Sequence, residues 1–353
     1  MTDLNLFQSA LARKNSGRPP VWFMRQAGRY HSHYQEMRKK YSFMQLCQLP
    51  QVACETTLGP IRDFDFDAAI LFSDLLFPLD ALGMGLSYTD SGPKLSWHLR
   101  QLSDLKRFKT GPGLSQNLEF QSLALKAIRQ ALPSSKGLLG FVGGPLTLFC
   151  YAVEGSHQGE LRSAKEGLKD GRFEGFCEVL FELLVDNLVS QARANADVVA
   201  VLDTCAGELD ESELKQFVVP ALRRVCEAFQ ARCPEGKLLY YSKSTGPSYW
   251  SQLVDLPILG LGIDWKHNLA QVLRDWHGRF AIQGNIDPSW LFLEPLELES
   301  RVRSVFNEVR ALPESMRQGW ICGLGHGVLP KTPEDHVRRV LRIQKEIFGG
   351  PTS

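Results

Sequence analysis

The chain has 353 residues, of which 44% are hydrophobic and 22% charged, and its formal net charge at pH 7 is +1. This balance is typical of a soluble globular protein, and it excludes the strongly basic surface that binds nucleic acid or an acidic membrane. A chain of this length forms either one large barrel or two medium domains, and either can bury a sizeable core.

Cysteine spacing and segment hydropathy predict a cytoplasmic protein. Eight cysteines are scattered along the chain without a C-x-x-C pair, which favours reduced thiols over a disulfide framework. Residues 1–16 lack the apolar core of a signal peptide. The longest uncharged stretch, residues 137–153, is shorter than a typical membrane span and is interrupted by glycines and Pro145. We therefore expect no export signal and no membrane insertion.

Short apolar runs alternate with helical patterns along the whole chain. They lie at residues 21–24, 68–72, 138–142, 198–202, 238–241, 258–262, 280–283 and 320–324. Near-continuous apolar runs are typical of strands buried on both faces, and their alternation with helices indicates parallel βα units. Eight such units predict a single-domain (β/α)8 TIM barrel, with a core at about residues 20–348 and the active site at the carboxyl ends of the strands.

The main alternative fold is a doubly wound sheet. The G-x-G-x-x-G fingerprint that would favour it does not follow the first strand, so dinucleotide binding loses support. The segments 88–95, 111–115 and 243–248, rich in Gly, Ser and Pro, are expected to be loops.

The stretch PVWFMRQAGRY at residues 20–30 places Arg25 and Arg29 directly after the first apolar run. If the chain is helical there, the two arginines share one face. Guanidinium groups in such a place need an anionic partner, because an unpaired buried charge is costly. One interpretation is a clamp for a carboxylate or phosphate; the other is structural ion pairing with Asp63, Asp65 or Asp67.

Polar residues follow all eight predicted strands, at the end where a barrel carries its chemistry. In chain order they are Arg25, Gln26 and Arg29, then Ser73 and Asp74, Gly143–Thr147 with Tyr151, Asp203 and Thr204, Ser242–Thr245, Asp264, residues 284–288, and His326.

Each of these residues also has a structural interpretation. A helix cap and a site residue are equally good interpretations of Asp74, and for Asp203, Asp264 and Asp287 the structural role is favoured. Residues 143–145 form either a simple turn or an anion-binding helix start, and Tyr151 is core or pocket. His326 stands between two glycines, where neither a helix nor a strand accounts for it, so a functional role is favoured.

No H-E-x-x-H motif, Cys/His cluster, nucleophile elbow or P-loop is present, and Cys322 with His326 makes only a weak pair of ligands. We therefore expect neither a metal nor a cofactor. The remaining set of arginines, acids, a tyrosine and a histidine suits acid–base chemistry on a polyanionic small molecule.

The motifs resemble those of the uroporphyrinogen decarboxylase family of haem biosynthesis. The resembling blocks run in order from residue 20 to about 340: 20–30, 52–61, 67–75, 140–148 with Tyr151 and residues 154–155, 262–265, 283–288 and 324–333. The resemblance implies a distorted TIM barrel, usually a homodimer, that uses no metal or organic cofactor. It also implies conversion of uroporphyrinogen III to coproporphyrinogen III, with four acetates becoming methyl groups and four CO2 released.

The same resemblance implies roles for individual residues. Catalytic roles fall on Asp74, Arg25, Arg29, Tyr151 and His326, with Asp74 accepting hydrogen bonds from the pyrrole N–H groups. The implied substrate-binding residues are Arg25, Gln26, Arg29, Phe72, Asp74, Tyr151, Thr204 and His326.

The sequence departs from the family pattern at several positions. Residues 31–33 are His-Ser-His where Leu-Pro-Glu is usual, Thr204 replaces a commoner Ser, residues 241–246 differ from a Phe-x-Lys-Gly form, and Gly323 replaces a common Asn. Two alternatives stay open: a zinc- and cobalamin-linked methyltransferase on the same barrel, for which no H-x-C motif is present, and a non-catalytic tetrapyrrole-binding protein.

Overall fold

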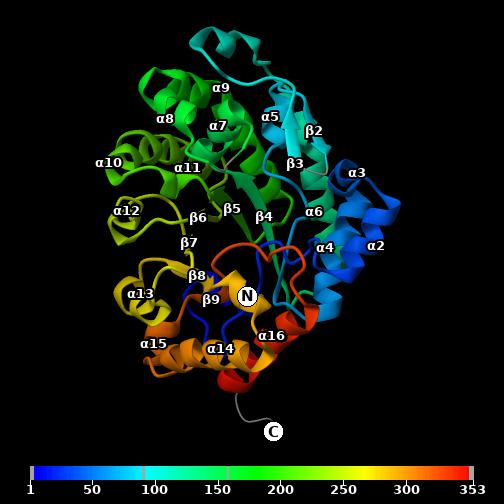
Figure 1. Ribbon diagram of the computed structural model, residues 1–353, viewed down its shortest axis with the longest axis vertical. Helices are drawn as coiled ribbons and strands as arrows, with labels where there is room; N and C mark the ends of the chain where they lie inside the picture. The colour runs from blue at the N-terminus through cyan, green and yellow to red at the C-terminus, as the bar shows by residue number, and fades with distance from the viewer. Residues whose placement is uncertain (1–3, 90–91, 157–158, 350–353) are drawn as a thin grey trace.

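The apolar runs predicted as strands form the inner wall of the structure. The computed structural model describes residues 4–89, 92–156 and 159–349. Within these residues, seven strands make a curled parallel sheet in the order β1-β4-β5-β6-β7-β8-β9 (Figure 1). Each strand is hydrogen-bonded to the strand that follows it in this order. They are β1 (Ala68–Ile70), β4 (Gly137–Gly143), β5 (Val198–Asp203), β6 (Leu238–Ser242), β7 (Gly260–Gly262), β8 (Ala281–Ile286) and β9 (Trp320–Leu324).

Residues 20–24 occupy the position of the eighth strand. Val21 forms a parallel bridge with Cys322 of β9, and its carbonyl accepts a hydrogen bond of 2.8 Å from the backbone of Asp67, just before β1. The segment therefore lies between the two edge strands of the sheet and closes the barrel. It is a single bridge and not a full strand, because Pro20 has no N–H to donate and the chain turns after Met24. The predicted TIM barrel is confirmed in this distorted form.

Amphipathic helices surround the sheet (Figure 1). The helices of the barrel and its amino-terminal extension are α1 (Leu6–Leu11), α2 (Ser32–Lys40), α3 (Phe43–Gln48), α4 (Pro50–Phe64), α5 (Phe77–Ala81), α6 (Glu119–Ala131), α7 (Pro145–Glu154), α8 (Arg162–Lys169), α9 (Arg172–Arg193), α10 (Glu211–Glu213), α11 (Val219–Arg232), α12 (Pro247–Ser251), α13 (Leu269–Trp276), α14 (Pro295–Arg310), α15 (Glu314–Arg317) and α16 (Glu334–Phe348). Short helical turns complete the connections: η1 (Leu102–Arg107), η2 (Leu114–Leu118), η3 (Ala206–Glu208), η4 (Leu214–Val218) and η5 (Pro288–Phe292).

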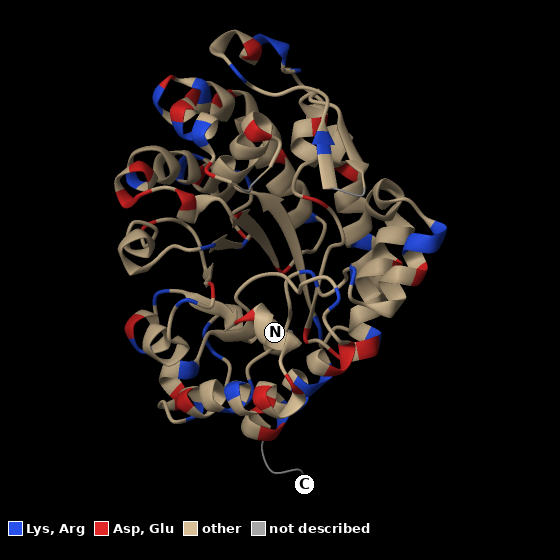
Figure 2. Ribbon diagram, in the orientation of Figure 1, with Lys and Arg blue, Asp and Glu red and all other residues tan. Residues whose placement is uncertain are grey.

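Charged residues lie mainly on these outer helices, whereas the strands are almost free of them (Figure 2). Both signs occur on the outer helices (Figure 2), and their totals nearly balance, with 40 Lys and Arg against 39 Asp and Glu. None of the helices in the described residues combines the length and the hydrophobicity needed to cross a membrane.

A hairpin replaces one of the predicted loops. Residues 88–95 were expected to be irregular, but β2 (Leu86–Thr89) and β3 (Gly92–Leu95) pair antiparallel there. Gly92, one of the residues that suggested a loop, is the first residue of β3, and residues 90–91 lie outside the described part. This hairpin brings Tyr88 against the ring of Phe43, with 4.4 Å between the ring centroids.

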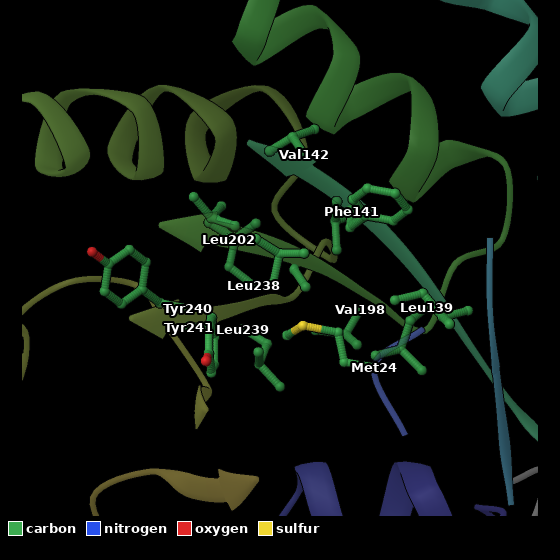
Figure 3. Packing of buried hydrophobic residues seen from close by; sticks show 14 of the residues in the cluster. Met24, Leu139, Phe141, Val142, Val198, Leu202, Leu238, Leu239, Tyr240 and Tyr241 are labelled. Carbon is green, nitrogen blue, oxygen red and sulfur yellow. The ribbon is translucent and has the colours of Figure 1, made fainter. Parts of the chain in front are cut away.

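The core fills the barrel and the space between the sheet and the helices. Every residue of β4, β5 and β6 is buried. Met24 of the closing segment joins Leu139, Val198 and Leu239 in the same cluster (Figure 3). Burial on both faces explains why these strands are apolar throughout and do not alternate with polar residues.

Candidate active site

The candidate site lies where the parallel strands end. Asp74 follows β1, Thr204 follows β5, His326 follows β9, and Arg25 follows the closing segment. Because carboxyl ends of parallel strands meet at one end of a barrel, residues distant in sequence are brought to a common mouth.

Arg25 and Arg29 lie on a turn and not on a helix. Arg25 has a left-handed backbone conformation, with φ of 61°, and both arginines are exposed. The helical arrangement considered from their spacing is therefore absent. The turn instead leaves both side chains exposed, and that of Arg25 reaches the loop after β9.

The acids proposed as structural partners of these arginines are engaged elsewhere. Their partners are Arg18 for Asp67 at 2.7 Å, Lys136 and Lys345 for Asp65 at 2.5 and 3.0 Å, and His31 for Asp63 at 2.7 Å. Among the described residues, neither Arg25 nor Arg29 forms an ion pair within 4.0 Å. Of the two interpretations of this arginine pair, the structure favours the anion clamp.

Arg25 connects the amino-terminal turn with the loop after β9. Its side chain lies against Gly327, where an added Cβ would come within 2.5 Å of the Arg25 Cδ atom. A larger side chain at position 327 would therefore require Arg25 to move. Burial raises the pKa of both Asp74 and Tyr151, and the positive charge of Arg25 opposes both rises, which places the three groups in one electrostatic neighbourhood.

Asp74 is partly exposed, and one of its carboxylate oxygens accepts a hydrogen bond of 2.9 Å from the backbone N–H of Leu76. This bond closes the turn before α5; the N-cap of that helix is Leu76, which has no side-chain cap, so the capping interpretation of Asp74 is wrong. Desolvation raises the pKa of Asp74 above its usual value, while the Leu76 N–H, the Tyr88 hydroxyl and Arg25 act in the opposite direction. A carboxylate with a perturbed pKa at a barrel mouth is typical of a functional group.

Tyr88 is a neighbour of Asp74 that motif reasoning missed. Its hydroxyl is buried and has no hydrogen-bond partner of standard geometry, yet it is close enough to Asp74 for each group to shift the pKa of the other. It was missed because it comes from the hairpin, which was expected to be a loop and does not follow a barrel strand.

Tyr151 is half-buried on α7, and the position of that helix is set by Asp203. Asp203 accepts hydrogen bonds from the backbone N–H and the hydroxyl of Thr147, at 2.9 and 2.7 Å. An added Cβ on Gly144 would come within 2.6 Å of the Asp203 carboxyl carbon, so glycine is required for this close approach. Burial raises the pKa of Tyr151, and the Asp74 carboxylate adds to the rise.

His326 is held by a tyrosine from the neighbouring wall of the barrel. The Tyr241 hydroxyl lies 3.1 Å from His326 Nδ1 and donates a hydrogen bond of 2.8 Å to the carbonyl of Gly325. The two rings are stacked, with centroids 5.9 Å apart and planes inclined by 11°. Tyr241 was not predicted, because it lies inside an apolar strand and not after its end.

The other predicted site residues take different positions. Gln26 is buried, and its amide bonds to the backbone of Phe23 and of Ala68, at 3.2 and 3.0 Å, which helps to close the barrel. Phe72 packs on Tyr34 with ring centroids 5.5 Å apart. Thr204 is half-buried beside Asp203 at the end of β5.

The remaining carboxylates at strand ends have structural roles, as their structural interpretation predicted, and Asp287 is the N-cap of η5. Asp264 accepts hydrogen bonds from the backbone of Ser244 and Lys266, and Asp287 from that of Ser289. In the described part of the chain, no group of three or more His, Cys, Asp or Glu side chains is arranged to hold a metal ion.

Comparisons with known proteins agree with these features. The model of the family described as "Uroporphyrinogen decarboxylase (URO-D)" matches residues 2–347. A protein named uroporphyrinogen decarboxylase from Chloroherpeton thalassium is 32% identical over 348 residues, covering 98% of each chain. Another of that name, from Vesicomyosocius okutanii, is 34% identical over 335 residues, covering 94% of each chain.

Among solved structures, a methyltransferase from Methanosarcina mazei superposes with a TM-score of 0.76. The superposition covers 98% of this chain and 100% of the other, at 16% sequence identity. At that identity the likeness concerns the fold alone.

The fold and the site together define an α/β-barrel enzyme whose mouth carries arginine, carboxylate, tyrosine and histidine side chains. The chain belongs to the uroporphyrinogen decarboxylase family, as the match over residues 2–347 shows.

Proposed function

We propose that this protein removes the four acetate carboxyl groups of uroporphyrinogen III, giving coproporphyrinogen III and four CO2. The family match along nearly the whole chain is the observation that carries the proposal. The site supports it, because Arg25 is close enough to act on Asp74, and neither Arg25 nor Arg29 has a carboxylate partner among the described residues.

Substrate binding uses the charge of the mouth. The substrate carries eight carboxylates, and guanidinium groups bind carboxylates through paired, directional hydrogen bonds. Arg25 and Arg29 take carboxylates of the substrate. Tyr151, Thr204 and His326 contact acetate and propionate groups, with Phe72 and Gln26 completing the wall.

Asp74 stabilises the charge that develops during the reaction. Protonation of a pyrrole ring at carbon makes the ring cationic and able to accept an electron pair. The bond between the acetate methylene and its carboxylate then breaks, CO2 leaves, and the electron pair of that bond neutralises the ring. Addition of a proton to the exocyclic methylene and loss of the first proton from the ring leave a methyl group. The net change is uptake of one proton and release of one CO2 for each acetate.

The carboxylate of Asp74 favours the cationic ring, since it lies close to the pyrrole N–H groups in a poorly solvated place where charge interactions are strong. Arg25, the cation whose charge acts on Asp74, is our candidate donor of the ring proton. We further propose that the protein is cytoplasmic and that it acts as a homodimer. Sedimentation of the purified protein would test the dimer.

Anaerobic incubation with uroporphyrinogen III in the dark tests the function. The products are oxidised and separated by the number of carboxylates. Species with seven, six, five and four carboxylates are expected. Unchanged substrate that nevertheless binds would favour a tetrapyrrole-binding protein, and absence of binding with stoichiometric zinc would favour the methyltransferase.

A further inference from the structure

The contact between Tyr241 and His326 determines where the imidazole carries its proton. Tyr241 is fully buried in β6, and its hydroxyl meets two groups of the β9 loop: the Gly325 carbonyl at 2.8 Å and His326 Nδ1 at 3.1 Å. A carbonyl can only accept a hydrogen bond, whereas an imidazole nitrogen either donates or accepts.

The phenol has a single hydrogen to donate. Burial raises the pKa of Tyr241, and the negative charge of Asp264 raises it further, so the group stays a neutral phenol at physiological pH. If that hydrogen pointed to Nδ1, the phenol and carbonyl oxygens would face each other at 2.8 Å with no hydrogen between them, which is repulsive. The hydrogen therefore points to the carbonyl, and the phenol oxygen has a lone pair left for Nδ1.

We propose that Tyr241 is a positioning residue that holds His326 as the Nδ1–H tautomer. The phenol oxygen accepts the hydrogen bond from Nδ1–H, and the stacking of the two rings fixes the orientation of the imidazole plane. Nε2 is then the nitrogen that accepts a hydrogen bond from the substrate or takes up a proton. The same contact suits the imidazolium form, because Nδ1 is protonated in both.

This assignment deepens the proposed function, since the importance of His326 rests on that function. The nitrogen that exchanges a proton with the substrate is chosen by the protein and not by the solvent. Tyr241→Phe keeps the ring and the stacking but removes the acceptor of Nδ1–H. The imidazole is then expected to shift toward the Nε2–H tautomer, which histidine prefers in water.

The tautomer can be measured directly on the full-length protein. Two-bond 1H–15N correlation spectra of 15N-labelled protein above pH 7.5 distinguish Nδ1–H from Nε2–H, and the His326→Gln variant assigns the signal. Tyr240→Phe is the matched control. Tyr240 is the preceding residue of the same strand, but its hydroxyl lies near Asp203 and Tyr249 instead, at 3.3 and 2.9 Å.

The expected result is Nδ1–H in the wild type and in Tyr240→Phe, with loss of that signature in Tyr241→Phe. We also expect kcat of Tyr241→Phe to fall about tenfold, which corresponds to the loss of one ordinary hydrogen bond. Nε2–H in the wild type or Nδ1–H retained in Tyr241→Phe would overturn the tautomer assignment. If the wild type is active, unchanged turnover of Tyr241→Phe would overturn the positioning role of Tyr241.

If Tyr241→Phe does not fold, the wild-type spectrum still decides, because Nε2–H there is incompatible with the assignment. The spectra need no substrate. A protein with the Nδ1–H signature but no decarboxylation would therefore keep the tautomer assignment while refuting the proposed function.

Discussion

Asp74 is the residue on which the proposed chemistry depends most. Its pKa is raised by desolvation, and three neighbours limit the rise. Since the folded-state pKa lies above that in the unfolded chain, ionisation of Asp74 costs folding free energy above its ordinary pKa, and this cost disappears as the pH falls below it. Ionisation of this carboxylate thus comes at some expense to stability, as is common at functional sites.

Asp74→Asn is expected to separate activity from stability. The amide oxygen can still accept the hydrogen bond of Leu76, but the negative charge is lost, so kcat should fall by about 100- to 1,000-fold. Because the cost of ionisation is also lost, Tm at pH 7.5 should be equal to or higher than that of the wild type. Porphyrin product analysis and thermal unfolding measure the two effects. Near-wild-type turnover in the folded variant would refute the role of Asp74.

Tyr88→Phe is expected to change the pH dependence. The Tyr88 hydroxyl lowers the pKa of Asp74, so its removal should raise that pKa further. If ionised Asp74 is required, kcat/KM is lost as the pH falls through this pKa, and the acidic limb of the profile should move to higher pH. Tyr41→Phe is the control, because Tyr41 is not among the groups that shift the pKa of Asp74. An acidic limb that stays in place would contradict the prediction.

The two arginines should be distinguishable by kinetics. Arg25→Gln removes the cation that acts on Asp74 and Tyr151, so kcat should fall by roughly 100-fold. Arg29 lies farther along the turn, where its charge acts on Tyr34, so Arg29→Gln should mainly raise KM, by about tenfold. Arg301→Gln, on the exposed face of α14, should change neither value. Equal effects of both site variants on kcat alone would argue against separate tasks.

At the scale of elements, the junction between β5 and α7 determines where Tyr151 lies. Asp203 at the end of β5 accepts two hydrogen bonds from Thr147 in the first turn of α7, and a third at 3.3 Å from Tyr240. Burial raises the pKa of Asp203 and these bonds oppose the rise. Asp203 of β5 thus caps α7, the helix that follows the neighbouring strand β4.

Thr147→Val tests this junction. The substitution keeps the shape of the side chain and removes one donor to a buried carboxylate, so the free energy of unfolding should fall by about 1–3 kcal/mol. Thr56→Val is the matched control, because Thr56 is equally buried but bonds only to the Val52 carbonyl of its own helix. Chemical denaturation measures both. Equal losses for the two variants would mean that the Asp203 contact contributes nothing particular.

At the scale of the whole molecule, the barrel depends on how its first and last segments meet. Arg18 donates two hydrogen bonds of 2.7 Å to Asp67, one to each carboxylate oxygen. Asp67 Oδ2 also accepts a hydrogen bond of 2.8 Å from the backbone N–H of Val21. This cluster ties the closing segment to β1 where a complete eighth strand is absent.

Asp67→Asn should weaken the closure of the barrel. Removing one partner leaves the guanidinium of Arg18 only partly compensated in a half-buried place, so the free energy of unfolding should fall by about 2 kcal/mol. Glu36→Gln, which breaks an exposed pair with Lys39, should leave the free energy of unfolding almost unchanged. Denaturant titration of both variants is the measurement. A loss for Asp67→Asn no larger than that of the control would contradict the role of this cluster.

The strands, the fold class and the family were predictable because each has a local signature. A strand buried on both faces must be apolar, and the motif blocks at 20–30 and 324–333 are long enough to be specific. The positions of Arg25, Asp74 and His326 at one mouth follow from the rule that parallel strands end together. Their roles in substrate binding and catalysis remain predictions.

Tertiary structure decided the rest, because those features depend on partners distant in sequence. Nothing within residues 20–30 indicates that Asp63, Asp65 and Asp67 are already paired with Arg18, His31 and two lysines. Likewise, the apolar run at 238–241 hides the contact of Tyr241 with His326, 85 residues away, and a segment that reads as a loop places Tyr88 beside Asp74. Amino-acid types determine which strands are buried and which motifs follow them, but only the closed barrel determines which charges remain unpaired and which hydroxyls meet the site.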